Sequence, residues 1–183
     1  MDSKITSTKR QRQAGMMLVE ALMSIGLTGL IMLVLVSVSV FSGRSFVALA
    51  NYVELDDKNR IAIDTITRDL RSCNRVFFYE TNFLALEDGD GWFVHYVYSP
   101  TTRTLIRSKA SQVSTLLTGC DSLVFNMGKR NTAPGTLDQY PAATAGEAKV
   151  VDVTWRCSRT ILGVKANTEA VQTAKIVIRK QGT

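Results

Sequence analysis

Few side chains in this sequence could bind a metal ion or act as a catalytic base. The chain has one histidine, His95, and three cysteines, Cys73, Cys120 and Cys157. Together they have the ligand types of a Cys₃His zinc site, but no two cysteines have the close spacing typical of such sites. We therefore predict no metal and no cofactor. Three cysteines can form at most one disulfide, between two of Cys73, Cys120 and Cys157, which leaves one thiol.

Other patterns of catalytic residues are also missing from the sequence. It contains no nucleophile elbow, no phosphate-binding loop and no zinc-protease helix motif. Strand-like alternation places His95 on one face with Phe93 and Val97, which favours a packed histidine over a catalytic one. Asp88 and Asp90 could bind calcium, but the segment lacks the further oxygen ligands of a calcium loop, so a turn is favoured. We therefore predict that the protein is not an enzyme.

One acidic residue, Glu20, lies inside a long apolar segment. Residues 16–43 hold 19 hydrophobic residues out of 28, and the 23 residues from Ala21 to Gly43 carry no charge. A helix of this length, at about 1.5 Å per residue, crosses the ~30 Å hydrocarbon core of a membrane. Four cations precede the segment, which predicts a single span with its N-terminus in the cytoplasm. A carboxylate in such a segment costs about 2.5 kcal/mol or more near its centre and less near an end, so Glu20 is expected to have a function.

The string QAGMMLVE at residues 13–20 resembles the type IV prepilin signature. In that family a short basic leader ends in glycine, and glutamate is the fifth residue of the mature chain. The resemblance implies that a prepilin peptidase cleaves after Gly15 and N-methylates Met16. It also implies that the apolar helix assembles with other pilin or pseudopilin subunits, and that Glu20 pairs with the N-terminal amine of a neighbour and fixes the register. Met16 departs from the family, whose usual first mature residue is Phe.

Beyond Gly43 the sequence predicts more helix and then a sheet. Apolar residues keep the spacing of a helix as far as Ser72, and no proline occurs before Pro100. The predicted fold class is α+β, with a long N-terminal helix packed on an antiparallel β-sheet. Residues 128–148 are expected to form a long loop. The β-branched and aromatic content predicts strands at residues 76–79, 92–98, 104–107, 123–126, 150–155 and 175–179.

This pattern divides the chain into four parts. They are a leader (1–15), a transmembrane and assembly helix (16–43), a periplasmic half of the helix (44–73) and a β-rich globular head (74–183).

A narrower resemblance comes from the end of the predicted helix. Residues 59–71, which end in Asp69-Leu70-Arg71, look like the helix end of J-type minor pseudopilins and PilW-type minor pilins. The pattern Leu116-Leu117-x-Gly119 and then Leu123-x-Phe125 is similar too. This implies a minor subunit near the tip of a type II secretion pseudopilus, anchored in the inner membrane with its head in the periplasm. The alternative within this class is a type IV pilus minor pilin for adhesion, motility or DNA uptake. The alternative from another class is an uncleaved, signal-anchored periplasmic enzyme or binding domain.

The positive charge of the chain gives little support for a nucleic-acid partner. The net charge is +6. Residues 1–15 contribute +3, Glu20 contributes −1 and residues 44–183 contribute +4. A solvated sheet face explains these basic residues without nucleic acid. The expected partners are therefore other pilin subunits, the prepilin peptidase and the inner membrane, and nucleic acid is the less favoured alternative.

Overall fold

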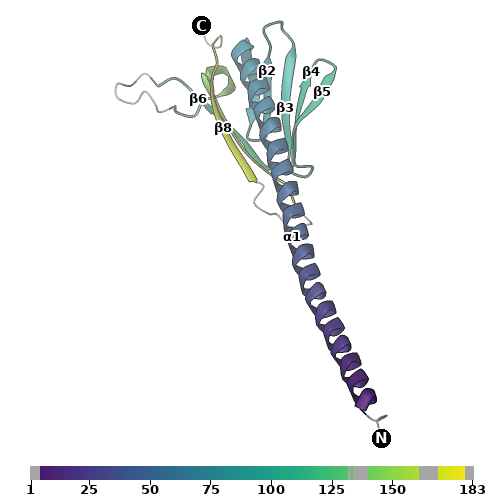
Figure 1. Ribbon diagram of the computed structural model, residues 1–183. Helices are drawn as coiled ribbons and strands as arrows, with labels where there is room; N and C mark the ends of the chain where they lie inside the picture. The colour runs from purple at the N-terminus through teal and green to yellow at the C-terminus, as the bar shows by residue number, and fades with distance from the viewer. Residues whose placement is uncertain (1–4, 132, 134–139, 161–168, 180–183) are drawn as a thin grey trace. The chain divides into compact units, whose positions relative to one another are not determined.

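The computed structural model consists of one long helix followed by two antiparallel sheets (Figure 1). It describes residues 5–131, 133, 140–160 and 169–179, of which residues 5–16 and Glu169 are described by their backbone alone. Contacts within the chain define two compact units, residues 1–47 and residues 48–183. This arrangement confirms the predicted α+β class with a long N-terminal helix.

Helix α1 runs from Ile5 to Ser72, so its predicted end at Ser72 is confirmed. It begins about three turns before residue 16, where the predicted transmembrane and assembly helix starts. The preceding residues contain no proline, and residues 9–14 are all Lys, Arg, Gln or Ala, which favour helix. In the second unit, α1 buries one stripe of side chains at three- and four-residue spacing. This stripe comprises Leu55, Asn59, Ala62, Ile66 and Leu70.

The first sheet is a meander of five antiparallel strands in the order β1-β2-β3-β4-β5. Alternate side chains of these strands point into the core, including Leu84, Val94 and Tyr96, which are fully buried. The opposite face carries exposed or half-buried residues, apart from the buried Ala85. The strand bounds are β1 Arg75–Glu80, β2 Phe83–Glu87, β3 Phe93–Ser99, β4 Thr104–Lys109 and β5 Gln112–Thr118.

The second sheet has three antiparallel strands in the order β6-β7-β8. Strand β6 spans Cys120–Gly128, β7 spans Val150–Ser158 and β8 spans Glu169–Val177. A short 3₁₀ helix, η1, covers Ala145–Glu147 in the segment between β6 and β7. In Figure 1, β6 and β8 are drawn on one side of α1 and β2 to β5 on the other. Buried residues of α1 and of both sheets form one hydrophobic core.

The chain passes from the first sheet to the second at Gly119, which has a φ of 65°. A Cβ atom there would lie 2.8 Å from the Ser158 carbonyl oxygen and closer still to the Arg159 guanidinium. Both the left-handed backbone and the close approach of β7 therefore require glycine.

The strand predictions were incomplete, and the last of them was displaced. The sequence predicted six strands, whereas the structure also contains β2 and β5, and eight strands form two sheets. The last strand ends at Val177, so it lies earlier than the predicted 175–179. The predicted turn at residues 87–91 exists, but it connects β2 to β3. Within the predicted loop 128–148, β6 ends at Gly128 and η1 lies near the end.

Candidate functional site

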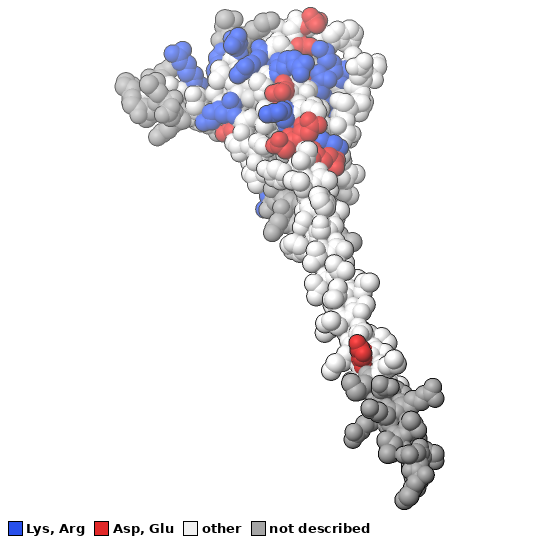
Figure 2. Space-filling view, viewed as in Figure 1, with Lys and Arg blue, Asp and Glu red and all other residues white. Residues whose placement is uncertain are grey.

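The apolar segment of α1 presents its large side chains to the surroundings on all sides. Of the described side chains from Met17 to Val53, no large hydrophobic residue is buried, and many are more than half exposed. The 18-residue window that best fits a membrane span has a mean hydropathy of 2.4 and no buried residue. By length and composition, α1 is thus a single candidate membrane helix. Figure 2 shows the membrane-span part of this segment as white, with a red acidic side chain in it.

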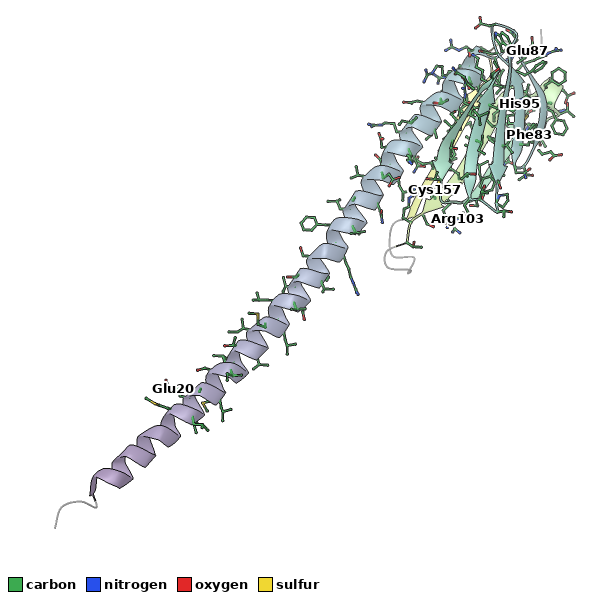
Figure 3. The ribbon with its side chains drawn as sticks, turned by 90° about the vertical axis from the view of Figure 1, so that its right-hand side faces the viewer. Glu20, Phe83, Glu87, His95, Arg103 and Cys157 are labelled. Atoms are coloured by element: carbon green, nitrogen blue, oxygen red, sulfur yellow. The ribbon has the colours of Figure 1, made fainter. Side chains whose placement is uncertain are left out.

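Glu20 is the one charged residue between Met16 and Gly43, and its side chain is exposed (Figure 3). Hydroxyl groups near it bond within the helix. Ser24 donates to the Glu20 carbonyl oxygen at 2.9 Å, and Thr28 donates to the Ser24 carbonyl oxygen at 2.7 Å. Ser37 and Ser45 bond in the same way to carbonyls one turn earlier. These four hydroxyl groups therefore have acceptors within the helix. A charged carboxylate such as that of Glu20 needs an external partner in an apolar environment.

The predicted cleavage position lies in the same helix. The backbone of Gly15 and Met16 belongs to α1, but the side chain of Met16 lies outside the described part. Cleavage and methylation at these residues therefore stay predictions. Along the chain, Glu20 lies about one helical turn after Met16.

Two buried polar contacts fix the second half of α1 to the sheets, and the sequence did not predict either. The first joins α1 to β7: the indole Nε1 of Trp155 donates to Oδ1 of Asn59 at 2.7 Å, and both residues are buried. Nothing near Asn59 in the sequence marks it as the acceptor of a buried hydrogen bond. Its role becomes visible only with the position of Trp155, because a buried indole N–H needs an acceptor.

The second contact joins α1 to β3 and β4 through Asp69. Oδ2 of Asp69 accepts hydrogen bonds from the Tyr96 hydroxyl at 2.5 Å and from Nε of Arg107 at 2.7 Å. Burial, and then the charge of Asp69, raise the pKa of Tyr96 above its ordinary value, so the phenol stays protonated as a donor. The hydrogen bond that Arg107 donates to Asp69 likewise raises the pKa of Arg107. Asp69 therefore acts as a buried anchor in the Asp-Leu-Arg stretch.

Asp88 takes part in a second ion pair of the first sheet. Its carboxylate accepts from the Lys109 ammonium, from the Ser72 hydroxyl at 3.2 Å and from the Gly89 N–H at 2.7 Å. The hydrogen bond from Lys109 is the largest cause that lowers the pKa of Asp88, and burial opposes it. Asp88 thus closes the end of α1 onto the sheet. Among the residues that the structure describes, no three His, Cys, Asp or Glu side chains come together as metal ligands.

His95 lies on the outer face of the first sheet, in β3 with Phe93 and Val97, as predicted (Figure 3). Its ring stacks with the ring of Phe83 at a centroid distance of 6.0 Å and with that of Phe93 at 6.4 Å. Phe77 contacts Phe93 edge-on at 5.5 Å. The histidine is therefore packed among aromatic rings.

The structure brings two of the three cysteines together. Cys120 in β6 and Cys157 in β7 are directly opposite each other in the strand pair. Cys73 follows the end of α1, and its thiol donates to the Leu70 carbonyl oxygen at 3.1 Å. All three side chains are buried. The sequence left the pairing open among the three, and only the register of β6 and β7 distinguishes them.

A polar cluster beside these two cysteines was not predicted. Nη2 of Arg103 donates to Asp121 at 2.5 Å and to the Ser158 hydroxyl at 3.1 Å, while that hydroxyl donates to Asp121 at 2.5 Å. Arg103 has a φ of 54° in the turn between β3 and β4. The cluster therefore holds that turn against the start of β6 and the end of β7.

Comparison of the sequence with protein-family models and with curated proteins found no match.

Proposed function

We propose that this protein is a minor pseudopilin or minor pilin. In this proposal a prepilin peptidase cleaves after Gly15 and methylates Met16, and the mature chain assembles near the tip of a type II secretion pseudopilus. Its role is to pack with related subunits through the apolar segment of α1, without catalysis. The observation that carries the proposal is the apolar helix with a single acid, which follows a basic leader ending in glycine.

The exposed apolar side chains support an assembly role. A helix that is apolar on all sides needs lipid or other apolar helices around it. The same segment can first anchor the precursor in the membrane and then pack against the helices of neighbouring subunits. The four cations of the leader favour a cytoplasmic N-terminus, which would direct residues 44–183 to the periplasm.

Glu20 supports a defined register between subunits. An isolated carboxylate in an apolar environment is strongly disfavoured, and a nearby ammonium group removes much of that penalty. Cleavage after Gly15 would create such an ammonium at Met16. In an assembled fibre, Glu20 of one subunit would then lie beside the N-terminal amine of the next.

The experiment that tests this proposal is an intact-mass measurement. The full chain is expressed in an inner membrane with an active prepilin peptidase, and in parallel with a catalytically inactive one. We expect the active peptidase to remove residues 1–15 and add one methyl group. A Gly15→Leu variant serves as the matched control and should keep its full mass. An unchanged mass of the wild-type chain, or cleavage near Ala50, would reject the proposal and favour a signal anchor or a signal peptide.

A further inference from the structure

We propose that Cys120 and Cys157 form a disulfide that joins β6 to β7, and that Cys73 stays a thiol. The two cysteines face each other in the register of the strand pair. The proposal rests on geometry within residues 48–183, so it does not require the pilin assignment. In the cell, however, the disulfide forms only if residues 48–183 lie in an oxidising compartment such as the periplasm, as the proposed function places them.

The hydrogen-bond pattern places the two cysteines at a position where cross-strand side chains lie close. The Cys120 N–H donates to the Arg103 carbonyl oxygen at 2.9 Å, while the neighbouring Ser158 N–H donates to Gly119 across the strands at 2.9 Å. The register of β6 shifts between Cys120 and Ser122, so the pair is judged from its other side. There the Ser158–Gly119 bond is the neighbouring hydrogen-bonded position, which makes Cys120 and Cys157 a non-hydrogen-bonded pair. Such pairs have a Cα separation of about 4.5 Å, which lies within the range of about 4.4–6.8 Å that a disulfide spans.

The surroundings favour a reaction between these two sulfur atoms. Both side chains are buried, with exposed fractions of 0% and 1%. The neighbouring thiol of Cys157 lowers the pKa of Cys120, and the same contact raises the pKa of Cys157. These opposite shifts reflect the contact between the two side chains in the paired strands. Cys73 bonds back to its own helix at Leu70.

The reaction is a thiol–disulfide exchange with a low-molecular-weight or protein disulfide. With glutathione disulfide, the thiolate of one cysteine of the pair attacks one sulfur, forms a mixed disulfide and releases one glutathione. The other cysteine then loses its proton and attacks the cysteine sulfur of the mixed disulfide, which closes the new bond and releases the second glutathione. Two cysteine thiols are oxidised and one glutathione disulfide is reduced to two glutathione molecules, whose thiolates take up the two protons that the cysteines lose. Both sulfur atoms are buried in the folded protein, where glutathione cannot reach them. The exchange therefore takes place during folding, before β6 and β7 are packed into the core.

The test counts thiols in the full chain. The protein is refolded in detergent with a glutathione redox buffer, trapped by acid, denatured in SDS and labelled with a polyethylene-glycol maleimide. We expect the wild-type chain to take one label, and three after reduction, because it contains three cysteines. Cys73→Ser should take none, and both Cys120→Ser and Cys157→Ser should take two. Peptide mapping of the unreduced wild-type chain should identify the pair.

Three labels on the unreduced wild-type chain, or a mapped bridge that includes Cys73, would overturn the inference. The Cys73→Ser variant decides the same point in a chain that keeps the proposed pair intact. The same labelling of protein taken directly from cells then tests the proposed location. A chain that is oxidised in the refolding buffer but fully reduced in cells would contradict the periplasmic placement and leave the pairing in place.

Discussion

The indole of Trp155 and the side-chain amide of Asn59, 96 positions apart in the sequence, form a buried hydrogen bond of 2.7 Å. This bond ties the middle strand of the second sheet to the buried stripe of α1. Together with the Asp69 contacts to the first sheet, it means that each sheet has its own polar attachment to the helix. Apolar contacts have no fixed direction, whereas these hydrogen bonds form only at one position of α1 along each sheet. They therefore fix the position of α1 on both sheets.

Replacement of Asn59 by alanine should destabilise residues 48–183 by about 1–3 kcal/mol, because it leaves the buried indole N–H of Trp155 without an acceptor. Denaturant unfolding of the full chain in detergent, followed by tryptophan fluorescence, measures the change. Arg60→Ala, at the exposed neighbouring position, should change stability by less than about 0.5 kcal/mol. Equal effects of the two substitutions would contradict the role given to Asn59.

Replacement of Asp69 by alanine should cost about 3–5 kcal/mol, since it leaves Arg107 charged and unpaired where only 17% of its side chain is exposed. The double variant Asp69→Ala/Arg107→Met should be less destabilised than the sum of the single changes. The pair Arg75–Glu87, in which the Arg75 side chain is 59% exposed, is the control, and Arg75→Ala should cost under about 1 kcal/mol. Additive single effects would argue against a buried ion pair.

The contribution of Asp88 to stability should disappear in acid. Its pKa is lowered in the folded state, mainly by the hydrogen bond from Lys109, so the folded protein favours the charged form. A carboxylate of this kind stabilises the fold above its unfolded pKa, and the contribution is lost as the pH falls through the folded pKa. The difference in unfolding free energy between the wild-type chain and Asp88→Asn should be constant above about pH 5 and shrink below about pH 4. Asp90→Asn, in the same turn but exposed, is the control, and a pH-independent Asp88 difference would refute the prediction.

Glu20→Gln should leave cleavage and methylation intact but reduce assembly, because the amide cannot form the charge pair with a neighbouring amine. The intact mass reports processing, and the amount of chain in sheared fibre or in cross-linked complexes with other subunits reports assembly. Ser24→Ala, one turn further along the same helix, removes only an internal hydrogen bond and should assemble normally. Normal assembly of Glu20→Gln would eliminate the register role.

Reduction of the proposed Cys120–Cys157 bridge should lower the unfolding free energy by about 3–4 kcal/mol, as expected for a closed loop of roughly 40 residues. Unfolding of the oxidised chain with and without reductant measures this difference. Cys120→Ser should show no response to reductant, whereas Cys73→Ser should respond like the wild-type chain. A reductant effect that persists in Cys120→Ser would have another origin.

The helix and most strands were predictable because their patterns are local. The end of α1 at Ser72 follows from apolar spacing, and six strands follow from β-branched and aromatic runs. Strand β5 was missed because it is an edge strand of mostly polar, exposed residues. The turns on either side of β4 use Arg103 and Ala110 at positive φ, where a sequence reader expects glycine or asparagine. The hairpin between β4 and β5 therefore carried no glycine, proline or asparagine at its turn, whereas the hairpin between β3 and β4 is marked only by Ser99-Pro100.

In the candidate site, too, the features that depend on neighbouring residues were predictable and the contacts between distant residues were not. The apolar segment and its single acid can be read directly from the sequence, since both depend on neighbouring residues. The partners of Asn59, Asp69 and Cys120 lie on strands far along the chain, so they depend on register and on the change of sheet at Gly119. A single sequence contains no pairing information of this kind.

Because Trp155 lies in β7, the contact between Asn59 and Trp155 can form only after β7 has been synthesised. The helix is synthesised first, yet the strand that caps its buried stripe ends at Ser158, near the end of the chain. Until β7 has emerged, Asn59 lacks its Trp155 partner, and the hydrophobic core that α1 shares with the second sheet is incomplete. We therefore expect the nascent chain to expose apolar surface of this core until its second sheet has been made.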